Sequence, residues 1–137
     1  MIKKIRELIT VPAMMLLIAV TTLLYSGYRA ELNQQNQTAR SAGFELLKAL
    51  NDLQMIIDAQ RYTPKNAPNF LDGWNKILRI DDMSDFINPT VQHQADLLHK
   101  EWQEHFENLQ SDTSNKALTI AIQSTRTSLK EAIHNLH

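Results

Sequence analysis

Five histidines and fifteen acidic residues are the groups of this 137-residue chain that could hold a metal ion. Glu101 and His105 are four residues apart, and His134 and His137 are three apart, so each pair would lie on one face of a helix. A complete site needs two such pairs that converge. The other two histidines are six residues apart, about 600° of helical turn, and so point in different directions. We therefore predict solvated or partly buried histidines, with no metal and no cofactor.

The remaining polar residues fit no catalytic pattern. Asp81, Asp82 and Asp85 stand in "DDMSDF", which lacks the alternating oxygen ligands and the glycine of a calcium loop. The chain has no cysteine, which excludes disulfides and thiolate sites. Its three glycines are isolated, so no phosphate-binding loop is present, and no G-x-S-x-G motif occurs. We expect no catalytic residues and no enzyme activity.

Two tryptophans and two arginines stand out as binding candidates. Trp102 falls at a helical seam position, which predicts a core residue, whereas Trp74 beside Gly73 could equally be core or part of a partner contact. Arg61 and Arg79 flank a proline-rich turn, where they could bind a small carboxylate or simply be solvated. These alternatives remain open at the level of sequence.

The elements that position these residues begin with an apolar segment. Leu8 to Tyr28 are 21 uncharged residues, and about 20 apolar residues cross a bilayer as a helix. Three basic residues precede this segment and Arg29 alone follows it closely, so residues 1–7 should be cytoplasmic. Tyr25 and Tyr28 would then lie at the outer interface of the membrane. We predict a transmembrane helix over residues 8–28 and an exported domain over residues 29–137.

A cleaved signal peptide is the alternative for the same segment. Signal peptidases need small residues at the last and third-last positions before the cut. Cleavage after Ala30 or Gly27 would place Tyr28 or Tyr25 at the third-last position. These bulky residues favour an anchor that is retained.

The exported part has the periodicity of helices throughout. Apolar and small residues repeat at spacings of three and four between Arg29 and Tyr62, which predicts one helix of more than 50 residues that continues from the membrane. The proline-rich stretch from Thr63 ends it. A short amphipathic helix over 70–80, a turn or a single helical turn over 81–88, and helices from Pro89 to about Gln110 and from about Thr113 to the end should follow. The predicted fold is all-α: a single transmembrane helix that continues into a membrane-tethered bundle of three long helices and one short helix.

The first exported helix carries a heptad seam, as in coiled coils, that predicts a contact with another protein or with a second copy of the chain. The residues we assign to that contact, together with Trp74, are Ala39, Gly43, Leu46, Leu50, Leu53 and Ile57. Residues 29–137 contain 11 Lys or Arg and 14 Asp or Glu, so a nucleic-acid partner is not expected.

These features predict a non-enzymatic, single-pass protein of a bacterial inner membrane. Its periplasmic helical bundle would bind other proteins as an accessory or assembly subunit of an envelope complex. The alternative is a periplasmic ligand-sensing module, because the layout of basic start, spanning helix and outer bundle resembles the front half of bacterial chemoreceptors and sensor kinases. That resemblance is one of layout and implies no particular residues, and the chain lacks the output domain of such receptors.

Overall fold

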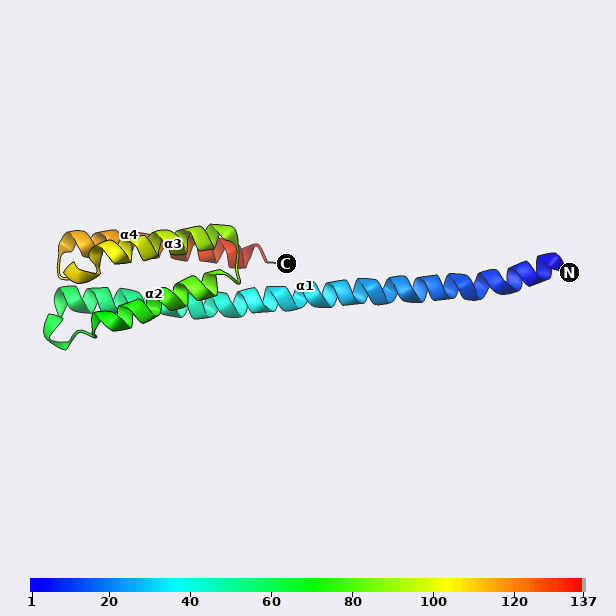
Figure 1. Ribbon diagram of the computed structural model, residues 1–137, viewed down its shortest axis with the longest axis horizontal. Coiled ribbons are helices and arrows are strands. Elements are labelled where there is room, and N and C mark those ends of the chain that lie inside the picture. Colours follow the sequence, from blue (N-terminus) through cyan, green and yellow to red (C-terminus); the bar gives the residue numbers. More distant parts are fainter. Residues whose placement is uncertain (137) are drawn as a thin grey trace. The chain divides into compact units, whose positions relative to one another are not determined.

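The computed structural model of the chain describes residues 1–136 and contains helices and no strand there. The described α-helices, labelled in Figure 1, are α1 (Ile2–Tyr62), α2 (Phe70–Ser84), α3 (Pro89–His105) and α4 (Asp112–His134). Two short 3₁₀ helices lie in the connections, η1 (Pro64–Asn66) and η2 (Phe106–Asn108). The chain forms two compact units, one up to Asn36 and one from Gln37 onward. The prediction of an all-α fold is confirmed.

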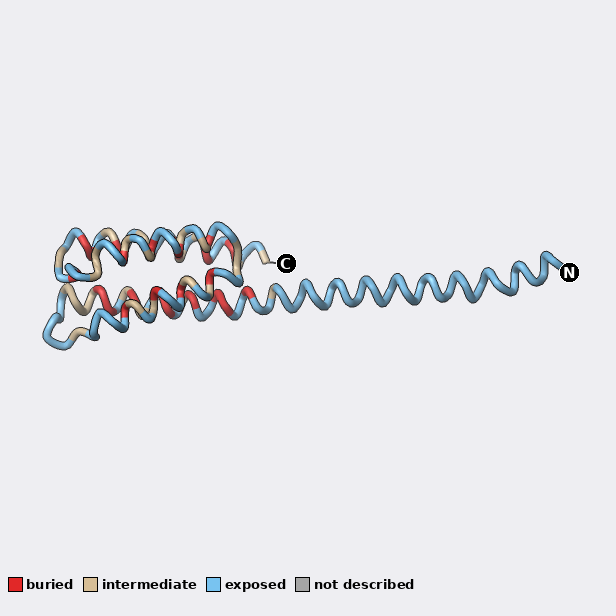
Figure 2. The backbone as a smooth tube through the Cα atoms, in the orientation of Figure 1, coloured by how far each residue is buried: buried red, intermediate tan, exposed pale blue. Residues whose placement is uncertain are grey.

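The first unit is a single helical segment with exposed side chains, drawn pale blue in Figure 2. Among the described residues, α1 is the one helix that is long and apolar enough to cross a membrane. The hydroxyl groups of Thr21 and Thr22 donate to the carbonyl oxygens of Leu17 and Ile18, at 2.7 and 2.8 Å. These bonds satisfy hydroxyl donors that would be costly to leave unpaired in hydrocarbon.

The second unit is a four-helix bundle made by α2, α3, α4 and the part of α1 from Gln37 onward. Short connections make sequential helices antiparallel neighbours. Side-chain contacts join each helix to the next around the bundle: Asp52–Lys76, Asp81–His99, His105–Ser114 and Gln54–Thr119. We call the end of the bundle where α1 and α3 end, and α2 and α4 begin, the loop end.

The bundle core is continuous along all four helices, and Figure 2 shows the buried residues as red bands within the bundle. Burial in α1 begins at Ala39, well beyond the apolar segment. At 25 cal/mol per Å², burying one leucine or isoleucine stabilises a fold by about 1.5–3 kcal/mol, so this core is the main source of stability. Its fully buried large side chains include Leu46, Leu50, Leu53, Ile57, Ile77, Leu98, Trp102, Leu118, Ile122 and Leu129.

Most helix limits follow the local signals in the sequence. α1 ends at Tyr62, directly before the proline-rich stretch, and Asn88 caps α3 by accepting a hydrogen bond from the amide of Val91 at 2.8 Å. Of the two alternatives for the residues after Ile80, a turn or a single helical turn, the structure shows the helical one, since α2 continues through Asp81 to Ser84. Ile80 and Ser84 are buried in the bundle, so packing overrides the turn propensity of "DDMSD".

Candidate functional site

Six of the seven residues predicted to bind a partner lie inside the bundle. Ala39, Gly43, Leu46, Leu50, Leu53 and Ile57 are all buried. Gly43 packs closely on α4, because a Cβ atom at this position would lie 2.7 Å from Cδ1 of Ile133. The heptad seam is therefore covered by the chain's own helices, and a partner reaches these side chains only if the bundle opens. Their role in partner binding stays a prediction.

The two tryptophans belong to one aromatic cluster between α2 and α3. Trp102 is fully buried, which confirms its assignment to the core. Trp74 is half-buried, and its ring lies edge-on to Trp102, Phe106 and His99, with centroids 6.1, 5.3 and 5.7 Å away. The structure thus packs Trp74 against the core, with part of the ring still accessible.

Both arginines near the proline-rich turn lie close to carboxylates of the protein itself. Arg61 lies 3.9 Å from Asp112 and Arg79 lies 3.3 Å from Glu45. The two guanidinium groups sit on different helices and do not form one anion site with each other. A small carboxylate would have to compete with these internal partners.

Tyr25 and Tyr28, predicted for the membrane interface, are both exposed on α1. The guanidinium of Arg29 lies 5.8 Å from the centroid of the Tyr25 ring. A tyrosine and an arginine in this relation are suited to the headgroup region, where a ring can sit in apolar surroundings while the charge stays hydrated.

An exposed face of α1 was missed by the sequence analysis. Phe44, Lys48, Met55 and Tyr62 follow helical spacing on an exposed side of α1, and we call them the outer face. Phe44, Met55 and Tyr62 are 66, 70 and 70% exposed. Large apolar side chains repeated along one exposed face are typical of protein contact surfaces. The same spacing rule that located the seam could have located this second, sparser stripe.

An apolar groove adjoins the outer face, between α1 and α2. It has a volume of about 500 Å³, and Met55 belongs to both the groove and the outer face. Met55, Ile56, Ala59 and Pro68 supply its apolar lining. Lys76 pairs with Asp52 at 3.0 Å beside it. The groove could receive an apolar side chain of a helix that lies on the outer face.

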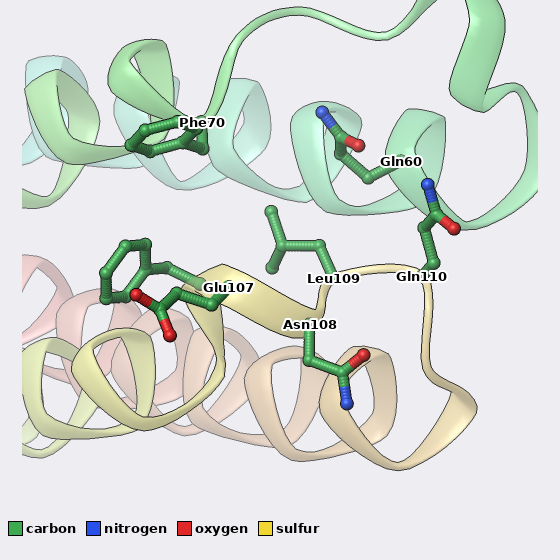
Figure 3. A pocket seen from close by; sticks show the side chains of 7 residues that line it. Gln60, Phe70, Glu107, Asn108, Leu109 and Gln110 are labelled. Atoms are coloured by element: carbon green, nitrogen blue, oxygen red, sulfur yellow. The ribbon is translucent and has the colours of Figure 1, made fainter.

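A second cavity, of about 520 Å³, lies at the loop end of the bundle (Figure 3). Figure 3 shows Gln60 and Phe70, from α1 and α2, on one side, and Glu107, Leu109 and Gln110, from the connection between α3 and α4, on the other. Phe106 and Asn108 complete the lining. Its volume falls in the range of small-molecule sites.

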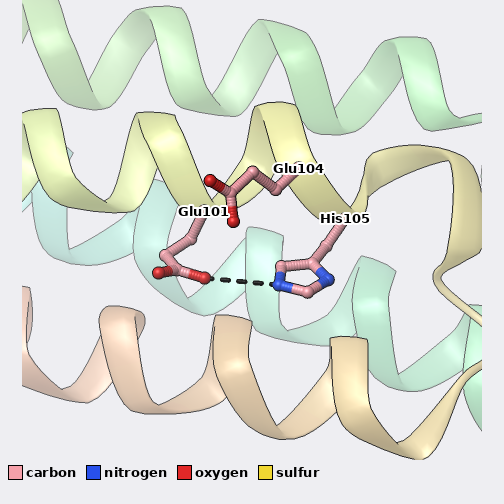
Figure 4. A group of neighbouring side chains, drawn as sticks. All are labelled: Glu101, Glu104 and His105. Atoms are coloured by element: carbon pink, nitrogen blue, oxygen red, sulfur yellow. Dashed lines mark ion pairs between the residues drawn. The ribbon is translucent and has the colours of Figure 1, made fainter.

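Glu101, Glu104 and His105 bring three possible metal-ligand atoms within 4.8 Å of one another (Figure 4). The sequence analysis had paired Glu101 with His105 and had not included Glu104. Nε2 of His105 lies 3.4 Å from Glu101, and Nδ1 lies 2.9 Å from the hydroxyl of Ser114 on α4. Both ring nitrogens thus have partners in the protein, and the group joins α3 to α4. The predicted pair of His134 and His137 includes a residue outside the described range.

Asp81 and His99 form a close ion pair between α2 and α3, at 2.5 Å. Burial raises the pKa of the Asp81 carboxyl above its usual value, although the hydrogen bond to His99 acts in the opposite direction. The other carboxylate oxygen, Oδ1, is buried and has no hydrogen-bond partner among the described residues. This pair is a titratable, half-buried contact between α2 and α3.

No protein-family model, no curated protein and no solved structure matches this chain.

Proposed function

We propose that the protein is a non-enzymatic, single-pass protein of a bacterial inner membrane whose periplasmic bundle binds another protein, as an accessory or assembly subunit of an envelope complex. The observation that carries the proposal is the outer face of α1. It leaves three large apolar side chains in solvent next to an apolar groove.

The anchor is supported by the apolar half of α1. Large apolar side chains from Leu8 to Leu24 are exposed by about half or more, and a soluble protein rarely exposes such a run. A bilayer would cover them. The excess of basic residues before the segment favours a cytoplasmic N-terminus and a periplasmic bundle.

The partner that fits the outer face best is a helix with apolar residues at spacings of three and four. Phe44, Met55 and Tyr62 would pack against its apolar stripe, and a large side chain at its centre would enter the groove beside Ile56 and Ala59. Aromatic side chains desolvated in this way contribute strongly to binding. Lys48 lies among them and would favour an acidic residue at the edge of the partner helix.

Site-specific photocrosslinking in native membranes tests this proposal. A benzoylphenylalanine is placed at Phe44, Met55 or Tyr62, and in a control variant at Ile120, which is 66% exposed on α4. The three outer-face positions should form an adduct with the same partner, identified by mass spectrometry, and the control should not. Adducts absent from all three positions, or equally abundant at Ile120, would contradict the proposal.

A further inference from the structure

The cavity at the loop end differs from the groove between α1 and α2 in the chemistry of its lining. Its residues come from three separate parts of the chain: the last turn of α1, the start of α2, and η2 with the residues after it. It is formed by the tertiary arrangement of the bundle. It shares α1 with the outer face used in the proposed function, because Gln60 lies between Met55 and Tyr62 in the sequence.

The charge of the lining has one sign. Among the described residues, Glu107 is the only ionisable one that lines the cavity, and none of these lining residues is Lys, Arg or His. Arg61 lies outside this lining, 3.9 Å from Asp112. A carboxylate with no basic residue in the same concave lining favours a cationic ligand and disfavours an anion.

The cavity also offers aromatic rings to an approaching cation. The rings of Phe70 and Phe106 lie 5.9 Å apart between centroids, at an angle of 40°. Trp74 holds Phe106 from the other side in an edge-on contact at 5.3 Å. An ammonium group within about 6 Å of a ring centroid is attracted by the negative face of the ring.

Polar acceptors also line the cavity. The amide nitrogen of Gln60 donates to the carbonyl oxygen of Pro68 at 2.7 Å. This bond fixes the amide group, so its oxygen is the atom that can accept from a ligand. Asn108 and Gln110 add two further side-chain amides to the lining.

We propose that the loop-end cavity binds a small organic cation, namely an ammonium group on an apolar body, with Glu107 as the counter-charge and Phe70 and Phe106 as aromatic walls. The ammonium would lie between the carboxylate and the ring faces. Leu109, which is buried, would contact the apolar body of the ligand.

The test uses the full chain in detergent micelles and three probes of one shape. Benzylammonium carries the proposed charge, benzyl alcohol is its neutral counterpart, and benzoate carries the opposite charge. Isothermal titration measures the binding. The fluorescence of Trp74 and Trp102, whose rings both lie against Phe106, reports whether the ligand is at this cavity. We expect saturable binding of benzylammonium, and binding of the other two at least about tenfold weaker, a difference of 1.4 kcal/mol.

Matched variants locate the binding site. Glu107→Gln removes the counter-charge from an exposed side chain and should weaken benzylammonium binding about tenfold or more. Glu104→Gln removes an exposed carboxylate that does not line the cavity and should leave the affinity unchanged. Partition of the probe into detergent is common to all variants and cancels in the comparison.

The supporting and the contradicting results can be told apart. Selective benzylammonium binding that is lost in Glu107→Gln and kept in Glu104→Gln supports the proposal. No saturable binding, equal binding of benzoate, or equal losses in the two variants would overturn it. None of these results bears on the crosslinks expected at the outer face. Positive results would favour the ligand-sensing alternative as a second role of the bundle.

Discussion

Gly73 is the residue at which the backbone of α2 lies directly against the indole ring of Trp102. A Cβ atom at Gly73 would be 2.2 Å from Cη2 and 2.3 Å from Cζ2 of that ring, and Trp102 is fully buried and has no free space to move into. Gly73→Ala should therefore destabilise the bundle by about 1–3 kcal/mol, measured by urea denaturation in detergent and followed by circular dichroism.

Gly43→Ala is the matched control for this substitution. Its Cβ atom would also meet a neighbour, at 2.7 Å, but that neighbour is Cδ1 of Ile133, the far end of a flexible and only half-buried side chain. The gain in helix propensity, about 1 kcal/mol, offsets part of the cost. Equal losses at the two glycines would contradict the close contact with Trp102.

Asp81 and Asp112 should make opposite contributions to the pH dependence of stability. The pKa of Asp81 is raised from 3.8 by burial, so its contribution is fully present below that value and is lost as the pH rises through the folded-state pKa. The pKa of Asp112 is lowered by its hydrogen bond and ion pair with Lys116, so its contribution is present above 3.8 and is lost as the pH falls.

Urea denaturation between about pH 3 and about pH 5.5 checks these signs. As the pH rises, the wild type should lose stability relative to Asp81→Asn and gain stability relative to Asp112→Asn. The second difference should be small, because Asp112 is exposed. If the stability of the wild type relative to Asp81→Asn and relative to Asp112→Asn changed in the same direction with pH, the opposite signs assigned to Asp81 and Asp112 would be contradicted.

At the scale of the helices, two asparagine caps differ in their geometry. Asn88 accepts from the amide of Val91 at 2.8 Å, whereas Asn69 accepts from the amide of Leu71 at the longer distance of 3.3 Å. Asn88→Ala should therefore cost about 1–2 kcal/mol of the free energy of unfolding and Asn69→Ala distinctly less. Thermal denaturation of both variants measures the difference. A larger loss of stability in Asn69→Ala than in Asn88→Ala would contradict the prediction.

The helices themselves were largely predictable from the sequence, because prolines, caps and apolar spacing are local signals. Asn88 and Pro89 marked the start of α3, and Tyr62 preceded the proline-rich stretch that ends α1. The choice between a turn and a helical turn after Ile80 was not predictable, since it depends on Ser84 and Ile80 packing against other helices. Local propensity is weak enough for such contacts to override it.

The candidate sites were harder to predict than the helices. A heptad seam shows which face of a helix is buried, but it does not show whether the covering helix belongs to the same chain. Leu46 and Leu50 are covered by the chain's own bundle. The loop-end cavity joins Gln60 to Glu107, which lie far apart in sequence, so only the folded bundle brings them together.

At the scale of the whole molecule, the account depends on an N-terminal anchor that stays in the membrane and holds the bundle on its outer side. The chain contains no cysteine, so single-cysteine variants can be labelled without background from the protein itself. Ile2 and Ser124 are both exposed, one before the apolar segment and the other on α4. Replacing either of them leaves every charged residue in place.

The most direct measurement is labelling of Ile2→Cys and Ser124→Cys with a membrane-impermeant maleimide in spheroplasts, before and after detergent lysis. The account predicts that Ser124→Cys is labelled in intact spheroplasts, that Ile2→Cys is labelled only after lysis, and that both proteins remain in the membrane at full mass. Labelling of Ile2→Cys in intact spheroplasts, protection of Ser124→Cys, or release of a shortened Ser124→Cys protein into the soluble fraction would contradict it.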